Sequence, residues 1–214
     1  MTTPVVTEVH TDRARNIDLW KDAEVYFSDA DDPKIGADGS LAPETWAYVG
    51  LLNVGSSISR ESEIERNDIE SFGGIKQMTD VKSKKDVRTF TPMENNGVVY
   101  EIMWPGSTAF TDDGVMVLAA PKTVTKGFFA FKTTNSFGDV LIDVTRRRAD
   151  AYIDSEEKND AGAEVHDVTV DVLEDDLGQW YDRLRIKSDG ATANETVAPI
   201  RVEGVTTAGP LPTA

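Results

Sequence analysis

The sequence contains no cysteine and only two histidines, His10 and His166. Without cysteine the chain can form neither disulfides nor thiolate metal sites. So few histidines leave almost no material for a Ser-His-Asp triad or a histidine metal site. A phosphate-binding loop is missing too, because Gly73-Gly74 precedes an expected strand and no Gly-Lys-Ser/Thr follows. The sequence therefore predicts no enzyme, no cofactor and no metal.

Long apolar runs are also missing. No stretch approaches the roughly 18 apolar residues that would indicate a membrane-spanning helix. The segment Met1 to Glu8 has neither a basic region nor an apolar one, so we expect no secretory signal peptide. A hydrophobic content of 39% is ordinary for a globular protein. These features predict a chain made in the cytoplasm, with no membrane partner.

Positive charge is scarce. Lys and Arg number 22 against 38 Asp and Glu, which gives a net charge of −16. Affinity for nucleic acid comes largely from cations that release counterions condensed on the phosphates. Tight, direct binding to DNA is therefore disfavoured.

Most of the chain has the short apolar and alternating runs of β-strands. We expect strands over residues 17–27, 46–52, 54–60, 75–90, 115–119, 123–132, 140–148, 165–172 and 179–187. Asn95-Asn96-Gly97 supplies a helix cap, and Pro105-Gly106 ends the single helix that we predict. The expected fold class is mostly β: a two-sheet β-sandwich with one flanking α-helix, a long inter-strand loop and extended terminal arms. The arms are residues 1–16 and 201–214, and the sandwich domain is 17–200.

The long inter-strand loop is expected at Glu61–Gly74, where charged residues surround few apolar ones. Such a segment buries too little to fold against its own domain, and a loop of this length is commonly functional. Apolar anchors there could contact a partner while the charges fix the register; a mobile loop is the other interpretation. The candidate contact residues are Arg60, Glu61, Glu63, Ile64, Glu65, Arg66, Asp68, Ile69 and Phe72.

An acidic loop, Ser28–Ser40, invites comparison with a calcium site. Aligned on Asp29, an EF-hand would need Gly at the sixth position and Glu at the twelfth, where this chain has Lys34 and Ser40. The EF-hand pattern fails, and a solvated turn is the simpler interpretation. A calcium-assisted carbohydrate-binding sandwich remains an alternative function, with ligands Asp29, Asp31, Asp32 and Asp38.

Four phrases occur in a distinctive order. Trp46-x-Tyr48-Val49-Gly50-Leu51-Leu52 is followed by the charged segment from Ser59 to Gly74, an alternating basic strand, and the helix between Asn95 and Pro105-Gly106-Ser107. Over roughly residues 17–190 this order resembles the major tail proteins of long-tailed bacteriophages, particularly siphophages of actinobacteria. The resemblance is one of element order and local phrases.

The resemblance implies a virion protein, the subunit of a tail tube. Subunits of that family form hexameric rings that stack into a hollow tube, through which DNA passes without tight binding. The implied partners are other copies of the chain, a tape-measure protein and tail-end proteins. A tail terminator or baseplate component of related fold is the alternative within the same class.

Overall fold

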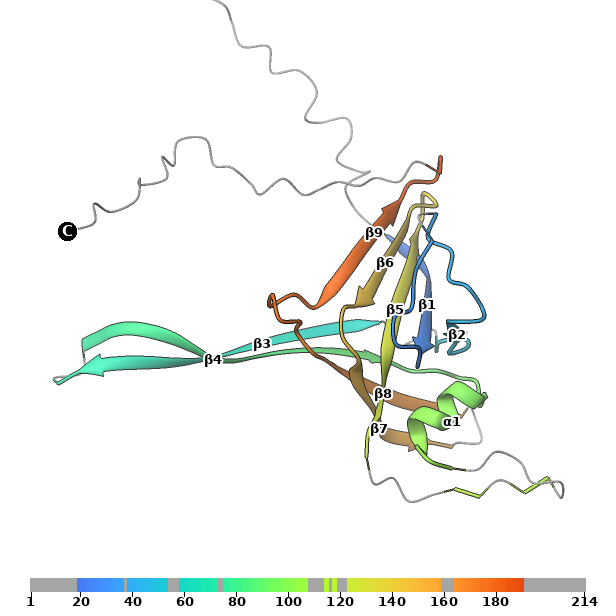
Figure 1. The fold of residues 1–214 in the computed structure, drawn as a ribbon, viewed down its shortest axis with the longest axis horizontal. Helices are drawn as coiled ribbons and strands as arrows, with labels where there is room; N and C mark the ends of the chain where they lie inside the picture. The colour runs from blue at the N-terminus through green and yellow to red at the C-terminus, as the bar shows by residue number, and fades with distance from the viewer. Residues whose placement is uncertain are drawn as a thin grey trace, which may run out of the picture.

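The computed structural model describes residues 19–36, 38–53, 58–72, 75–107, 114–115, 117–118, 123–158 and 164–190. These residues form nine strands and one helix (Figure 1). In chain order the elements are β1 Trp20–Ser28, β2 Ala47–Tyr48, β3 Ser59–Ser71, β4 Ile75–Phe90, α1 Gly97–Met103, β5 Thr125–Asn135, β6 Val140–Thr145, β7 Ala149–Glu157, β8 Val165–Val172 and β9 Tyr181–Ile186. The predicted mostly-β fold with one helix is confirmed.

All strand pairs are antiparallel, and β5 belongs to two sheets. Its residues from Phe128 onward pair with β1, and Ala130–Thr134 pair with β6 on the opposite edge. Its first three residues, Thr125–Gly127, pair instead with β7. One sheet therefore has the order β2-β1-β5-β6-β9, and the sheet curls at β5 into a second, β5-β7-β8-β4-β3. This arrangement is compatible with the predicted sandwich.

The main core lies between the two sheets. Strands β1 and β5 contribute Val25, Phe27, Phe129 and Phe131, while Phe90, Val168 and Val170 come from β4 and β8. The rings of Phe129 and Phe131 stack with their centroids 6.2 Å apart. Burying each of these side chains stabilises the fold by about 1.5–3 kcal/mol.

Helix α1 covers one side of this core with Val99 and Ile102, both buried. Its start is fixed by Asn96, whose side-chain oxygen accepts the backbone N–H of Val98 and of Val99 at 3.1 Å. The amide nitrogen of the same side chain donates to the Val49 carbonyl oxygen at 2.8 Å. One asparagine therefore caps the helix and ties it to the segment after β2, as the sequence predicts for the cap.

Several predicted elements differ in the structure. The strand expected at 46–52 is only the two-residue β2. Trp46 still closes the preceding turn, where its backbone N–H donates to the Ala42 carbonyl oxygen at 2.8 Å, and Gly50 has a positive φ of 109°, which extended strands do not adopt. Strand β7, Ala149–Glu157, is not among the strands expected from the sequence. The predicted strand at 140–148 ends at Thr145.

Other predictions fall wholly or partly outside the described residues. These are the two terminal arms, the first part of the strand expected at 54–60, and two residues of the strand expected at 115–119.

Candidate functional site

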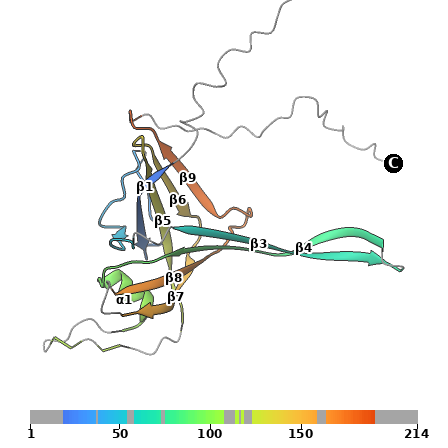
Figure 2. The ribbon, with the colours of Figure 1, turned by 180° about the vertical axis from the view of Figure 1, so that it is seen from behind.

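The β3–β4 hairpin projects from the sandwich as a two-stranded arm (Figures 1 and 2). Strand β3 pairs with β4 over its whole length, from Ser59 opposite Thr89 to Ser71 opposite Ile75. Strand β4 pairs with β8 only from Asp86 to Phe90. Among the described residues, the hairpin beyond Lys85 therefore has no other strand beside it.

The predicted loop at Glu61–Gly74 is wrong, because its described part is strand β3 and the turn residue Phe72. Strand formation here depends on pairing across the hairpin and not on burial. Opposite charges face each other at Glu63 and Lys85 and again at Glu70 and Lys76. Two irregularities in the register, at Glu65/Arg66 and at Ile69/Glu70, interrupt the ladder, and bulges of this kind increase the twist of a hairpin.

Asp68 ties the two strands of the arm together near the tip. Its carboxylate accepts a hydrogen bond from Thr79 at 2.8 Å and pairs with the Lys76 ammonium, also at 2.8 Å. The hydrogen bonds from Lys76 and then Thr79 lower the pKa of Asp68 below its ordinary value. The Asp68 side chain is 46% exposed, so this contact orders the arm locally without adding much to global stability.

Large apolar side chains on the arm face solvent. Ile69 and Met78 lie directly opposite each other, and 44% and 55% of their surfaces are exposed. Ile64 and Val81 are exposed to a similar degree, and Phe72 at the turn is fully exposed. Apolar groups gathered on a protruding element are typical of a contact surface. The arm thus offers apolar anchors among alternating charges.

A buried polar network holds the base of the arm. Asp86, completely buried on β4, accepts hydrogen bonds from Arg60 Nε at 2.7 Å and from the Tyr181 hydroxyl at 2.5 Å. The Arg60 guanidinium also lies over the rings of Trp180 and Tyr181. Burial, together with the hydrogen bond to Asp86, raises the pKa of Tyr181 well above its usual range, and Asp86 likewise raises the pKa of Arg60. The contacts join the hairpin to β9.

A second carboxylate extends this network to the first sheet. Asp143 on β6 accepts a hydrogen bond from Arg88 at 2.8 Å and two from Arg183, at 2.6 and 2.8 Å. Arg88 also donates to the Tyr181 hydroxyl at 3.2 Å. Both Arg88 and Asp143 are buried, and hydrogen bonding to Asp143 raises the pKa of Arg183. The network therefore links β3, β4, β6 and β9 where the arm leaves the sandwich.

The outer face of the second sheet is acidic. One row of directly opposite residues crosses five strands: Lys126, Asp150, Asp171, Val87 and Glu61. Directly opposite residues point to the same face, here away from the core. Three further carboxylates lie beside this row. Asp154 accepts a hydrogen bond from Thr169, Asp167 accepts one from Thr91, and Glu63 lies directly opposite Lys85. Two lysines, Lys126 at 3.2 Å from Asp150 and Lys85 at 3.5 Å from Asp171, offset only part of this charge.

The nine predicted contact residues fall into two groups. Arg60 belongs to the network at the base, so its role is to hold the arm. The other eight, Glu61, Glu63, Ile64, Glu65, Arg66, Asp68, Ile69 and Phe72, lie along β3 or at its turn. Sequence reasoning missed Met78 and Val81, two further exposed apolar side chains, which lie on the facing strand β4.

Three of the four acidic residues considered as calcium ligands are already matched to other groups. Asp32 pairs with Lys34 at 2.6 Å, Asp31 with Arg148 at 3.0 Å, and Asp38 accepts from Ser40. Within the described part of the chain they do not gather into a group that could hold a cation. The structure thus offers the calcium-assisted alternative no assembled site.

One other group of possible metal ligands brings together Glu156, Glu164 and His166. The Lys158 ammonium already sits between the two glutamates, at 2.5 Å from Glu156 and 2.9 Å from Glu164. His166 Nε2 bonds to Asn95 Oδ1 at 2.6 Å. A lysine at the centre of this cluster supplies the positive charge that a metal ion would bring.

Comparison with known proteins gives no assignment: no family model and no curated protein matches the chain. Within the described residues, no helix is long and apolar enough to cross a membrane.

Proposed function

We propose that the chain is a structural virion protein, the tail tube subunit of a long-tailed bacteriophage. Copies of it assemble into hexameric rings, and the rings stack into a hollow tube through which DNA passes. The projecting β3–β4 hairpin is the observation that carries this proposal. A catalytic or ligand-binding domain has little use for a long arm that extends into solvent, whereas a subunit that must reach its neighbour needs one.

The arm supports assembly through two kinds of contact. Burying exposed side chains such as Ile69, Met78 and Phe72 against a neighbouring copy stabilises the contact between the two copies. The backbone of β3 offers a second contact, because β3 is the last strand of its sheet among the described residues. An edge strand of this length is a template for pairing with another chain, and closing sheets across subunits removes the exposed edge.

The acidic outer face of the second sheet supports passage of DNA. Carboxylates such as Asp150 and Asp171 repel phosphates and release no counterions from DNA. If this face lines the tube, double-stranded DNA moves past it without adhering. The surface of one subunit alone would then carry the charge pattern needed for the whole lumen, since the rings repeat it by symmetry.

Self-assembly tests the proposal directly. Sedimentation over a range of concentrations, with negative-stain microscopy of the same samples, should show rings or hollow tubes of uniform width. A chain that stays monomeric at every concentration contradicts the proposal. Isolated rings that never stack would instead support the tail terminator of related fold.

Point variants then test the role of the arm. Replacing both Ile69 and Met78 with Thr should abolish tubes and leave the melting temperature within about 2 °C of wild type, because both side chains are about half exposed and threonine keeps a strand-favouring side chain at each position. Leu177→Thr is the matched control, since Leu177 is 76% exposed but lies in the loop between β8 and β9. Tubes that survive the double substitution would show that these two side chains are not needed for assembly.

A further inference from the structure

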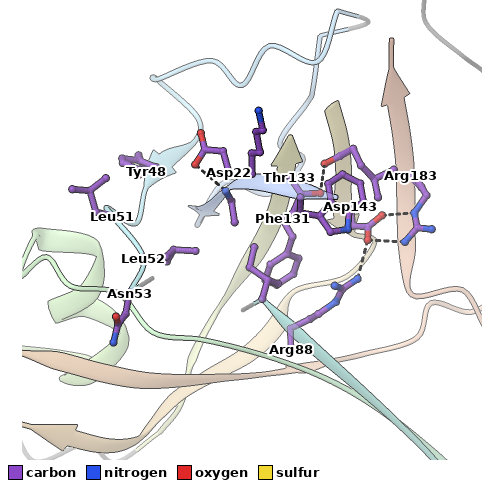
Figure 3. Close-up of a pocket in the computed structure, with 15 residues that line it drawn as sticks. Asp22, Tyr48, Leu51, Leu52, Asn53, Arg88, Phe131, Thr133, Asp143 and Arg183 are labelled. Carbon is purple, nitrogen blue, oxygen red and sulfur yellow. Dashed lines mark hydrogen bonds and ion pairs between the residues drawn. The ribbon is translucent and has the colours of Figure 1, made fainter. Parts of the chain in front are cut away.

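A groove of about 510 Å³ opens beside the buried network (Figure 3). One wall is apolar and is formed by Tyr48, Leu51 and Leu52. The opposite side carries Asp143 and Arg183, which are joined by two hydrogen bonds. Because these two groups already bind each other, the surface that the groove offers to a partner is its apolar wall and its floor.

The floor of the groove is the part of the first sheet next to the main core. Val25 on β1 and Phe131 on β5 lie directly opposite each other and are buried in that core. The next row on the same face, formed by Ala23, Thr133 and Leu141, lines the groove and is only half-buried. Covering such a face removes apolar surface from water and is favourable.

Large apolar side chains gather around this groove. Leu51 is 63% exposed, and Trp20 and Tyr48, which also line the groove, are exposed as well. Single exposed apolar side chains are ordinary on a protein surface, but a group of them around a hollow is typical of a contact site. The arm is the other place described above where such side chains face solvent.

The arm of the same molecule points away from the groove. In both views the β3–β4 hairpin leaves one side of the sandwich, whereas β1 and β2, which contribute to the groove, lie on the other side (Figures 1 and 2). An arm with this direction can reach the groove of another copy and not its own.

We propose that the groove receives the Ile69–Met78 pair of a neighbouring copy. This inference rests on the proposed function, because it names the surface that the arm contacts. Ile69 and Met78 are directly opposite each other, and the Cβ atoms of such residues lie about 4.5–5.5 Å apart, so the two side chains form one compact apolar projection. The volume of the groove is within the range of about 300–1,000 Å³ that holds drug-sized ligands, and two apolar side chains therefore fit.

Charge at the rim of the groove favours this partner. Lys21 is exposed there, and the described part of the chain provides no ion pair for it. Its neighbour Asp22 accepts the backbone N–H of Ala23 at 2.9 Å. Strand β3, which carries Ile69, has five Asp or Glu against two Arg, and Glu70 is exposed. Attraction between Lys21 and this acidic strand adds to the apolar contact and helps to fix its register.

The absence of cysteine allows a cross-linking test in which every link joins two molecules. Met78→Cys chains and Leu51→Cys chains, each with a single thiol, are mixed under conditions of assembly and treated with a short bismaleimide. Intact mass and peptide mapping identify the products. Met78→Cys mixed with Leu177→Cys is the matched control, because Leu177 is exposed but lies in the loop between β8 and β9.

We expect about tenfold more product between positions 78 and 51 than between 78 and 177, because docking holds the first two thiols close together. Lys21→Glu, added to the Leu51→Cys chain, should lower the yield of the first product several-fold. Equal yields in the two mixtures, or a yield that Lys21→Glu does not change, would overturn the proposal.

Microscopy of the same samples separates this inference from the proposed function. Tubes without an excess of the 78–51 product would overturn the groove as the receiving surface and would still support the tail tube. An excess of the 78–51 product in assemblies other than rings or tubes would support the groove and contradict the tail tube. A chain that stays monomeric at every concentration, without this product, would overturn both.

Discussion

Removal of the Asp143 carboxylate isolates the energetic role of the network at the base of the arm. Asp143→Ala leaves the Arg88 guanidinium, 9% exposed, without its anionic partner. Breaking a buried ion pair by removing one partner typically costs about 3–5 kcal/mol, because a charge is left desolvated. Arg88 keeps its hydrogen bond to Tyr181 and lies 5.1 Å from the centre of the Phe131 ring, so we expect the lower end, about 3 kcal/mol.

For a chain of 214 residues this loss lowers the melting temperature by about 6–12 °C. Thermal and urea unfolding, followed by the fluorescence of the four tryptophans, measures it. Asp182→Ala is the matched control: Asp182 pairs with Arg146 at 2.6 Å but is 69% exposed, so its loss should cost less than about 1 kcal/mol. Equal losses in the two variants would refute the reasoning.

A second substitution separates the stranded charge from the cavity that the alanine leaves. Adding Arg88→Met to Asp143→Ala removes the uncompensated guanidinium and keeps an apolar side chain of similar length. We expect the double variant to be more stable than Asp143→Ala alone, because buried ion pairs replaced by apolar residues are often neutral or stabilising. A double variant that is less stable would assign the loss to packing.

Three further predictions concern the helix, the arm and the acidic face. Asn96→Ala should cost about 1–2 kcal/mol in urea unfolding by removing the cap of α1, and Asn96→Asp should recover only part of it, because it keeps the accepting oxygen but places a carboxylate oxygen against the Val49 carbonyl oxygen. The lowered pKa of Asp68 means that its contribution is present above the ordinary value of 3.8 and is lost as pH falls through the lowered value. The protection factors of amides near the tip of the arm, which correct for the intrinsic exchange rate at each pH, should therefore fall at acid pH in wild type, and Asp68→Asn should remove this dependence. Wild-type tubes should not bind double-stranded DNA at low salt. Tubes of the Asp150→Lys/Asp171→Lys variant should bind it, with an affinity that falls as the salt concentration rises. Wild-type tubes that bind DNA as tightly as the variant would contradict a lumen that repels DNA.

Local signals in the sequence were sufficient where a structure is determined by neighbouring residues. The cap at Asn96 and the stop at Pro105 predicted α1, and the alternation from Ile75 to Phe90 gave the bounds of β4. Strand β3 was misassigned because its composition was judged by how much it could bury. Its order comes from pairing with β4, which is a contact between segments that composition does not reveal.

The polar network at the base of the arm could not be predicted from the sequence, for a different reason. Tyr181 and Asp86 are 95 residues apart, and Arg88 and Asp143 are 55 apart, so only the folded topology brings them together. One signal was nevertheless present in the sequence. Asp143 interrupts the apolar run Val140-Leu141-Ile142-Asp143-Val144, and a carboxylate inside a buried strand needs a cationic partner.

The arm and its base have opposite physical properties: the base is buried and rigidly held, and the arm is exposed. A two-stranded hairpin alone is marginal in water, so an arm that must point in a defined direction needs a rigid attachment. Asp86 and Asp143 provide it, because each is buried and holds side chains from more than one strand. Beyond Lys85 the arm keeps both faces open and carries apolar side chains that water does not favour. The proposed subunit needs two properties to contact the same place on each neighbour. One is a fixed direction of the arm at its base, and the other is exposed apolar surface towards its tip.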